Sequence, residues 1–243
     1  MAVKTGDVQK AVATGSERFS RSLRSDVFED EVKKLAELEQ NPYIGFEKDF
    51  LRWMLSDGAG AFLLSDEKNE TGISLCVNWL EGISYANEKD TCMYMASEKL
   101  EDGTLKSYMD YSPEEITSQS VLSIKQDVKL LSENIVALGG LKLRSIMAKK
   151  GLRSADVDYF LPHMSSEFFR DKIAGELVAM GLDIPPEKWF VNLSNIGNIG
   201  AGSIYLMVDE LFRSGRLKKD EKILLMVPES SRFSYVFALL TVC

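Results

Sequence analysis

The stretch Asp158-Tyr159-Phe160-Leu161-Pro162-His163-Met164-Ser165-Ser166 contains the only histidine of the chain. Its short apolar run stops at the polar side chain of His163, and a helical pattern opens within a few residues. In open α/β sheets, ligands and catalytic groups gather at the carboxyl ends of the strands. The stretch therefore predicts a strand that presents His163 at the functional end of a sheet.

A second segment, Asn195-Ile196-Gly197-Asn198-Ile199-Gly200-Ala201-Gly202-Ser203, has the same form, because it also lies between an apolar run and a helical pattern. We expect Asn198 and His163 to form one candidate active site, since both follow strands of one sheet. Each also has a plainer interpretation: His163 as a structural histidine, and Asn198 as a turn residue beside glycine. The glycines do not follow Gly-x-Gly-x-x-Gly, and no Gly-Lys-Ser/Thr follows, which argues against a nucleotide-binding loop.

The C-terminal part of the chain alternates between strand-like and helical patterns. We expect strands at Tyr159–Pro162, Trp189–Leu193, Glu221–Val227 and Phe233–Val242, and helices at Ser166–Met180 and Gly200–Ser214. This β-α-β-α-β-β order predicts an α/β fold with a mixed sheet flanked by helices, in which the last strand is antiparallel.

The preceding part is less regular. We expect strands at Lys10–Gly15 and Ile73–Ala86, a glycine turn feeding a strand at Ser56–Leu64, a weak helical stripe at Ser20–Asn41, and a long helix at Val121–Lys150 that could break at Gly139-Gly140. Residues 88–118 are rich in Met, Tyr and charge, which indicates an irregular insertion that caps a pocket or forms a dimer contact. We divide the chain into residues 1–66 and 67–243, with the insertion inside the second part.

Composition limits the class of protein. Hydrophobic residues make up 45% of the chain and charged residues 27%, as in a soluble globular protein. The net charge of −8 argues against nucleic acid as a partner, and no apolar run is long enough to span a membrane. Cys76, Cys92 and Cys243 are odd in number and widely spaced, which favours a reducing cytoplasm and no zinc site. We expect Cys76 to pack in the core.

The basic residues of the C-terminal part are clustered. One group lies on both sides of His163 in the sequence and consists of Lys142, Arg144, Lys149, Lys150, Arg153, Arg170 and Lys172. A smaller group is Arg213, Arg216, Lys218 and Lys219. They are either solvated helix ends, where cations are favoured, or a docking surface for an acidic carrier.

Several motifs resemble one family. They are Gly15-Ser16-Glu17, Ser56-Asp57-Gly58-Ala59-Gly60-Ala61, His163 after a proline, Asn198 before Ile199-Gly200, Ser203-Ile204 with Asp209-Glu210, and Gly215-Arg216-Leu217-Lys218. In this order they resemble the thiolase-fold condensing enzymes, most closely the β-ketoacyl-acyl-carrier-protein synthase III group. The resemblance covers nearly the whole chain except residues 88–118. The fold that it implies is thiolase-like, with a C-terminal βαβαββ half and the end of an N-terminal half.

The resemblance also implies a reaction. It is the decarboxylative condensation of a malonyl-thioester with an acyl thioester, with acyl-CoA and malonyl-acyl-carrier-protein as substrates and no bound cofactor or metal. His163 and Asn198 would then stabilise the enolate, as oxyanion-hole donors do. The family acts as a dimer, so we expect a homo-oligomer or a heteromer with a thiolase-fold chain.

Two departures from the family pattern affect this interpretation. The family's nucleophilic cysteine lies on a helix before the strand that ends at Gly15-Ser16-Glu17, and none of the three cysteines occupies that place. The isolated chain is therefore expected to lack acyl transfer and to decarboxylate slowly at most. The family's glycine-rich final turn is here Val227–Phe233, where backbone donors of Ser230 or Ser231 could serve. The alternative is a non-catalytic thiolase-fold subunit or scaffold of a heteromeric condensing enzyme.

Overall fold

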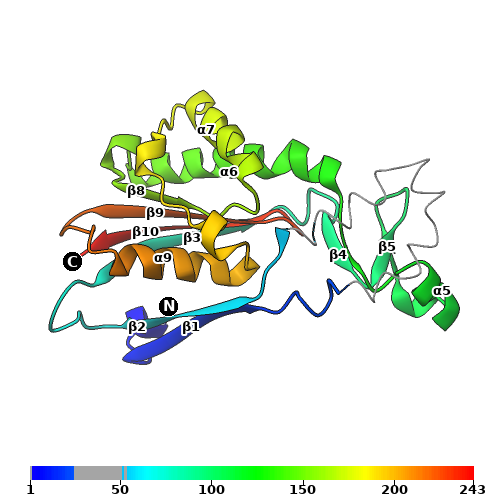
Figure 1. Cartoon of the computed structure of the whole chain (residues 1–243). Helices are drawn as coiled ribbons and strands as arrows, with labels where there is room; N and C mark the ends of the chain where they lie inside the picture. Colours follow the sequence, from blue (N-terminus) through cyan, green and yellow to red (C-terminus); the bar gives the residue numbers. More distant parts are fainter. Residues whose placement is uncertain (1, 25–50, 52–53) are drawn as a thin grey trace.

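A four-stranded mixed sheet is the centre of the fold (Figure 1). The structure is a computed structural model that describes residues 2–24, 51 and 54–243. The strand order is β3-β10-β9-β8, and the strands are β3 (Leu75–Ser84), β8 (Tyr159–Pro162), β9 (Lys222–Glu229) and β10 (Ser234–Val242). Strands β8 and β9 are parallel, whereas β10 is antiparallel to both β9 and β3. The predicted mixed sheet with an antiparallel last strand is confirmed.

Helices cover both faces of this sheet. Helices α6 (Val128–Lys150) and α7 (Arg170–Ala179) lie on one face, and α9 (Ser203–Arg213) lies on the other (Figure 1). Phe160 of β8 joins the core under α6 and α7, and its neighbour Leu161 joins the core under α9. Because both faces are buried, β8 and β9 are nearly continuous apolar runs, as is typical of parallel strands. Burying each large aliphatic side chain contributes about 1.5–3 kcal/mol.

A two-stranded antiparallel ribbon packs on the far side of α9 (Figure 1). It consists of β1 (Lys10–Glu17) and β2 (Gly58–Ser65). A Cβ at Gly15 would lie 2.3 Å from the Ala201 carbonyl oxygen, and one at Gly60 would lie 2.3 Å from Tyr205 Cβ. The glycines of Ser56–Leu64 therefore lie inside a strand instead of forming the predicted turn, and they let the ribbon approach the helix.

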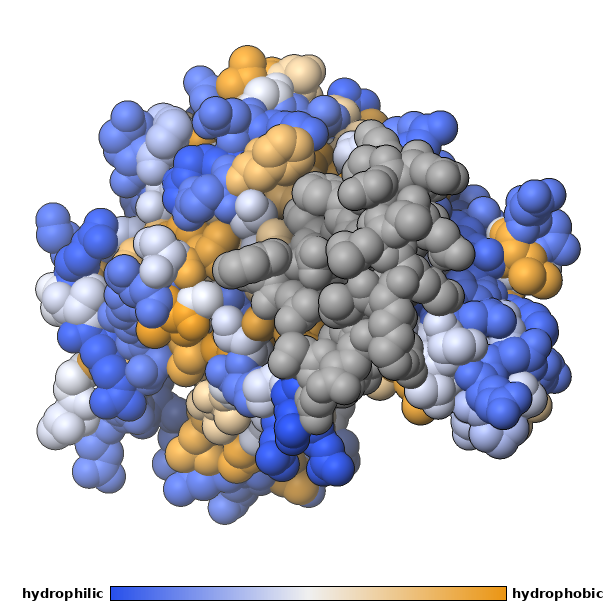
Figure 2. All heavy atoms as spheres, turned by 45° about the vertical axis from the view of Figure 1, so that its right-hand side comes forward, coloured by the Kyte–Doolittle hydropathy of each residue, from blue (hydrophilic) through white to orange (hydrophobic). Residues whose placement is uncertain are grey.

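The outer face of the ribbon is exposed and carries two large apolar side chains among small and polar ones. Val12 is 66% exposed and Leu63 is 69% exposed. Figure 2 shows apolar surface at the bottom of the molecule, where Figure 1 places the ribbon. Among the described strands, the ribbon pairs with no strand beyond its own two.

Residues 88–118 are more regular than predicted. Strand β4 (Met93–Met95) pairs with β7 (Ile124–Gln126), β5 (Ser97–Lys99) pairs with β6 (Leu105–Ser107), and α5 (Pro113–Ser118) follows. The helix predicted from Val121 begins only at Val128, because Ile124–Gln126 pairs with β4 and Asp127 caps the helix through Leu130 N. Helix α6 continues through Gly139-Gly140, where Met226 and Tyr235 pack closely.

Two other sequence predictions are wrong. The strand predicted at Trp189–Leu193 is reduced to one parallel bridge between Phe160 and Trp189, and α8 (Leu193–Ile196) begins at its end. Cys76 is exposed, because it lies near the start of β3, which is the edge strand of the sheet.

The remaining predictions on the N-terminal part have mixed outcomes. The strands at Lys10–Gly15 and Ile73–Ala86 are confirmed as β1 and β3. Most of Ser20–Asn41 lies outside the described residues. The division at residue 66 stays a prediction.

The other elements are short. They are α1 (Ala2–Thr5), η2 (Tyr108–Asp110), η3 (Ser154–Asp156), η4 (Glu167–Phe169), η5 (Pro186–Lys188) and η6 (Gly200–Gly202). None of the helices in the described ranges is both long and apolar enough to cross a bilayer.

Candidate active site at the strand ends

His163 directly follows β8 and continues its pairing, since its N–H donates to the Met226 carbonyl over 2.8 Å. The side chain is only 9% exposed, and no described residue forms a hydrogen bond with its ring. Burial lowers the pKa of His163 from 6.5 to about 4. The imidazole is therefore neutral at pH 7 and has one ring N–H to donate.

Asn198 is held in the turn between α8 and η6. Its backbone carbonyl accepts a hydrogen bond from Ser56 N over 2.8 Å, and its side-chain Oδ1 accepts one from Gly200 N over 3.0 Å. The side chain is 5% exposed, and its Nδ2 has no hydrogen-bond partner among the described residues. Because Oδ1 is already bound, the carboxamide presents its N–H groups on the opposite side.

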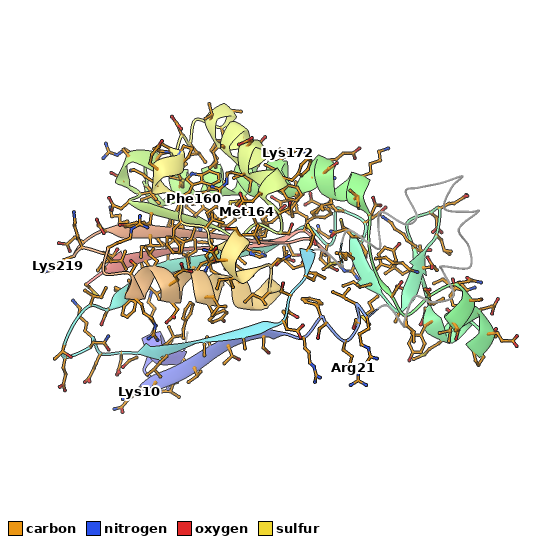
Figure 3. All side chains as sticks on the ribbon, in the orientation of Figure 1. Lys10, Arg21, Phe160, Met164, Lys172 and Lys219 are labelled. Atoms are coloured by element: carbon orange, nitrogen blue, oxygen red, sulfur yellow. The ribbon has the colours of Figure 1, made fainter. Side chains whose placement is uncertain are left out.

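The two residues lie at the same end of the sheet. Phe190 N donates to the Phe160 carbonyl over 2.9 Å, so the chain at Trp189 and Phe190 runs parallel beside β8. From Phe190 the chain continues through α8 to Asn198. In Figure 3, the labels of Phe160 and Met164 show the direction in which β8 runs. Because β8 and β9 are parallel, β8 ends at the same edge of the sheet as the turn between β9 and β10. His163 directly follows β8, whereas α8 lies between the bridge at Trp189 and Asn198, so convergence of the two side chains on one site stays a prediction.

The turn between β9 and β10 also closes this end. Ser231 N donates to the Glu229 carboxylate, and Arg232 N donates to the same group over 3.2 Å. Ser231 Oγ donates to the Met93 carbonyl over 2.6 Å, which ties the turn to β4. The Ser231 N–H therefore already has an acceptor within the protein. An oxyanion-hole donor from the Ser230 backbone N–H stays a prediction.

The end of the ribbon contributes polar residues that the sequence analysis assigned no role. Glu17 Oε1 accepts a hydrogen bond from Ala201 N over 3.2 Å, next to the Asn198 turn. Asp57 accepts hydrogen bonds from Ser20 N and Ser20 Oγ over 2.8 and 2.6 Å. The Ser20 hydroxyl is the main cause that lowers the pKa of Asp57.

An open hollow of about 400 Å³ lies just beyond β1. Arg18, Ser20, Arg21 and Arg24 line it. The spacing of three residues between successive arginines was the sequence signal that could have indicated this cluster. Guanidinium groups that line a hollow favour an anion as its occupant.

Most of the predicted docking residues have local partners. Lys149 and Lys150 both pair with Glu81 of β3. Arg153 pairs with Asp156 and Arg170 pairs with Glu167, each at 2.6 Å. Lys172, labelled in Figure 3, lies 4.1 Å from the centre of the Phe168 ring. Lys142 and Arg144 lie on α6. The docking role of this whole group of basic residues stays a prediction, and neighbouring carboxylates neutralise part of its positive charge.

None of the three cysteines has the surroundings of an activated nucleophile. Cys92 is fully buried, and desolvation raises the pKa of its thiol to about 12. Its Sγ lies 3.4 Å from the Asp127 carbonyl. Cys76 is exposed on the edge strand, and Cys243 is the last residue. The described residues hold no group of His, Cys, Asp and Glu side chains that could bind a metal ion.

Comparison with known proteins points to one family. Residues 147–228 match the family described as 3-oxoacyl-[acyl-carrier-protein (ACP)] synthase III C terminal. The chain is a thiolase-fold relative of the β-ketoacyl-acyl-carrier-protein synthase III condensing enzymes. This range contains both His163 and Asn198.

Relatives of the synthase III group match along most of the chain. It is 27% identical over 172 residues to the enzyme of Hyphomonas neptunium, covering 70% of this chain and 46% of that one. With the enzyme of Clostridium perfringens it shares 25% identity over 226 residues, covering 92% and 57%. The solved synthase III of Thermus thermophilus superposes with a TM-score of 0.65 at 20% identity, covering 99% and 61%. The chain thus spans about half the length of these curated relatives.

Proposed function

We propose that this chain is a β-ketoacyl synthase III-like acyltransferase in which His163 and Asn198 stabilise the enolate formed from a malonyl-thioester. One observation carries the proposal. Two buried side chains at the same end of the sheet each keep an N–H donor that no described residue accepts. Both residues are largely buried, and an N–H that no described residue accepts is available to a ligand.

The geometry suits decarboxylation. When the malonyl carbon–carboxylate bond breaks, carbon dioxide leaves and its electron pair passes to the thioester, whose oxygen gains negative charge. A neutral imidazole N–H and a carboxamide N–H donate to that oxygen without having to lose a proton. Each such donor contributes about 2.7–4 kcal/mol to the transition state. The low pKa of His163 keeps the imidazole neutral for this role.

The enolate carbon would then attack an acyl thioester. In this proposal the acyl group is not carried by Cys76, Cys92 or Cys243. Cys92 is buried with a raised pKa, and among the described residues no basic side chain forms a hydrogen bond with the thiol of Cys76 or Cys243. The thiol that accepts the acyl group comes from a segment outside this sequence or from a partner chain.

The substrates would be acyl-CoA and a malonyl-acyl-carrier-protein, both of which carry phosphate. The hollow lined by Arg18 and Arg21 would contact such an anion, because Arg18 directly follows Glu17, whose carboxylate bonds Ala201 N beside the Asn198 turn. No cofactor is needed for this chemistry.

The test is release of labelled carbon dioxide from malonyl-CoA carrying ¹⁴C in its free carboxyl group. We expect slow release by the full chain, and a loss of roughly 100-fold or more in His163→Ala and in Asn198→Ala. Ser132→Ala, at an exposed position of α6, is the control and should keep the wild-type rate. Unchanged release in both site variants would contradict the proposal, as would stable acyl labelling of any of the three cysteines by radiolabelled acyl-CoA.

A second candidate function is a non-catalytic subunit that shapes the pocket of a thiolase-fold partner. The exposed outer face of the ribbon favours it, together with Leu80 of β3, which is 65% exposed. Such apolar surface usually marks an interface. In this case neither site variant changes the activity of the complete assembly, whereas Val12→Asp or Leu63→Asp dissociates it, as measured by sedimentation.

A further inference from the structure

Glu17, the last residue of β1, reaches the turn that carries Asn198. Its Oε1 accepts a hydrogen bond from Ala201 N over 3.2 Å, across 184 positions of sequence. A Cβ at Gly200 would lie 3.1 Å from both Cγ and Oε1 of Glu17, so the two residues are in direct contact. This side chain therefore joins the ribbon to the start of η6.

Two neighbouring N–H groups at this helix start each have one acceptor. Gly200 N donates to Asn198 Oδ1, and Ala201 N donates to Glu17 Oε1. N–H groups at the start of a helix have no acceptor within the helix, so each needs one from elsewhere. A carboxylate is also favoured there by the helix dipole.

We propose that Glu17 is a positioning residue for the Asn198 carboxamide, an inference that rests on the function proposed above. Because Glu17 occupies the Ala201 N–H, Asn198 Oδ1 is left to Gly200. That bond fixes Nδ2 on the other side of the carboxamide, where it donates to the thioester oxygen. Without Glu17, the N–H of the exposed residue Ala201 turns to water or competes for Asn198 Oδ1. The carboxamide then turns, and Nδ2 loses its orientation.

Glu17→Ala and Glu17→Gln test this role, with Asp209→Ala as the matched control. Asp209 lies on α9, the helix that directly follows η6, where it pairs with Arg213 at 2.7 Å. We expect Glu17→Ala to lower kcat for malonyl-CoA decarboxylation roughly three- to tenfold with little change in KM. Glu17→Gln keeps an acceptor oxygen and should remain within about twofold of wild type. An equal loss in Asp209→Ala, or no rescue by glutamine, would overturn the inference.

A double variant shows whether Glu17 acts through Asn198. In the Asn198→Ala background, Glu17→Ala should cause no further loss of kcat. A full additional loss would mean that Glu17 acts by another route and would overturn the proposal.

Nuclear magnetic resonance of the ¹⁵N-labelled chain separates this inference from the proposed function. We expect Glu17→Ala to shift the Ala201 backbone amide and the Asn198 side-chain NH₂ signals, and Asp209→Ala to leave both in place. Shifted signals without decarboxylation by any form of the chain would refute the proposed function and support the positioning contact. Unmoved Asn198 side-chain signals in Glu17→Ala would refute the positioning role even where decarboxylation is present.

Discussion

The end of β8 and the turn at residues 195–203 each present one candidate donor, but they hold it by different means. His163 is fixed by burial, and no described residue bonds its ring. Asn198 is fixed by hydrogen bonds from Ser56 and Gly200. Desolvation therefore sets the protonation state of the first donor, and a network that includes the ribbon sets the orientation of the second. The β8 end should respond to pH, and the turn should respond to changes in the ribbon.

The largest effect on the turn is expected from Gly15→Val. A side chain at Gly15 would collide with the Ala201 carbonyl, only 2.3 Å from the new Cβ, and backbone on both sides limits relaxation. We expect a loss of about 3 kcal/mol in the free energy of unfolding, measured by urea denaturation.

The matched control for Gly15→Val is Gly175→Ala on α7, where a Cβ meets nothing within 4 Å. This change should be neutral or stabilise the protein by up to about 1 kcal/mol, because alanine is the better helix former. Similar urea midpoints for Gly15→Val and wild type would show that the ribbon does not constrain the turn.

The β8 end should show a pH dependence that the turn lacks. Burial lowers the pKa of His163 to about 4, whereas the unfolded chain keeps the ordinary value of 6.5. As the pH falls below 6.5, the unfolded state binds a proton that the folded state takes up only near pH 4. The contribution to stability is thus present above pH 6.5 and is lost as the pH falls toward 4.

Between pH 7 and pH 5 we expect wild type to lose about 2 kcal/mol of unfolding free energy more than His163→Gln does. Asn198→Ala should keep the wild-type dependence, because the carboxamide does not titrate. Equal pH dependence in wild type and His163→Gln would show that the imidazole is not held neutral by burial.

A smaller effect is expected from Ser203→Ala. Ser203 Oγ accepts a hydrogen bond from Ile199 N over 3.0 Å, inside the turn. Its removal leaves a buried N–H without an acceptor, which costs about 1–2 kcal/mol in thermal or urea unfolding. Ser132→Ala on the exposed side of α6 is the control, since Ser132 only donates to the Lys129 carbonyl. Comparable small losses in both variants would show that the turn does not depend on this bond.

Much of the fold could be predicted from the sequence, because β8, β9 and β10 are apolar runs whose boundaries are clear in the sequence. The segment Trp189–Leu193 has the same composition but forms a single bridge, since α8 begins at Leu193. The late start of α6 follows from the pairing of Ile124–Gln126 with β4, a contact across about thirty residues that local pattern does not show. The exposure of Cys76 likewise depends on its place at the edge of the sheet.

The candidate site could likewise be predicted from the sequence only in part. His163 and Asn198 were predicted because each stands alone at the end of an apolar run. Glu17 was not assigned a role, because its hydrogen bond to Ala201 joins two segments that only the folded chain brings together. The use of the Ser231 N–H by Glu229 is a detail of turn geometry, and the sequence carries no signal for it.

The central claim is that the imidazole of His163 and the carboxamide of Asn198 donate to one oxygen. It is tested most directly by titrating the ¹⁵N-labelled chain with a malonyl-CoA analogue whose free carboxylate cannot leave. We predict that the His163 ring and Asn198 side-chain signals shift together along one saturation curve with a single Kd. Movement of only one of the two, or different Kd values for the two groups, would contradict the account.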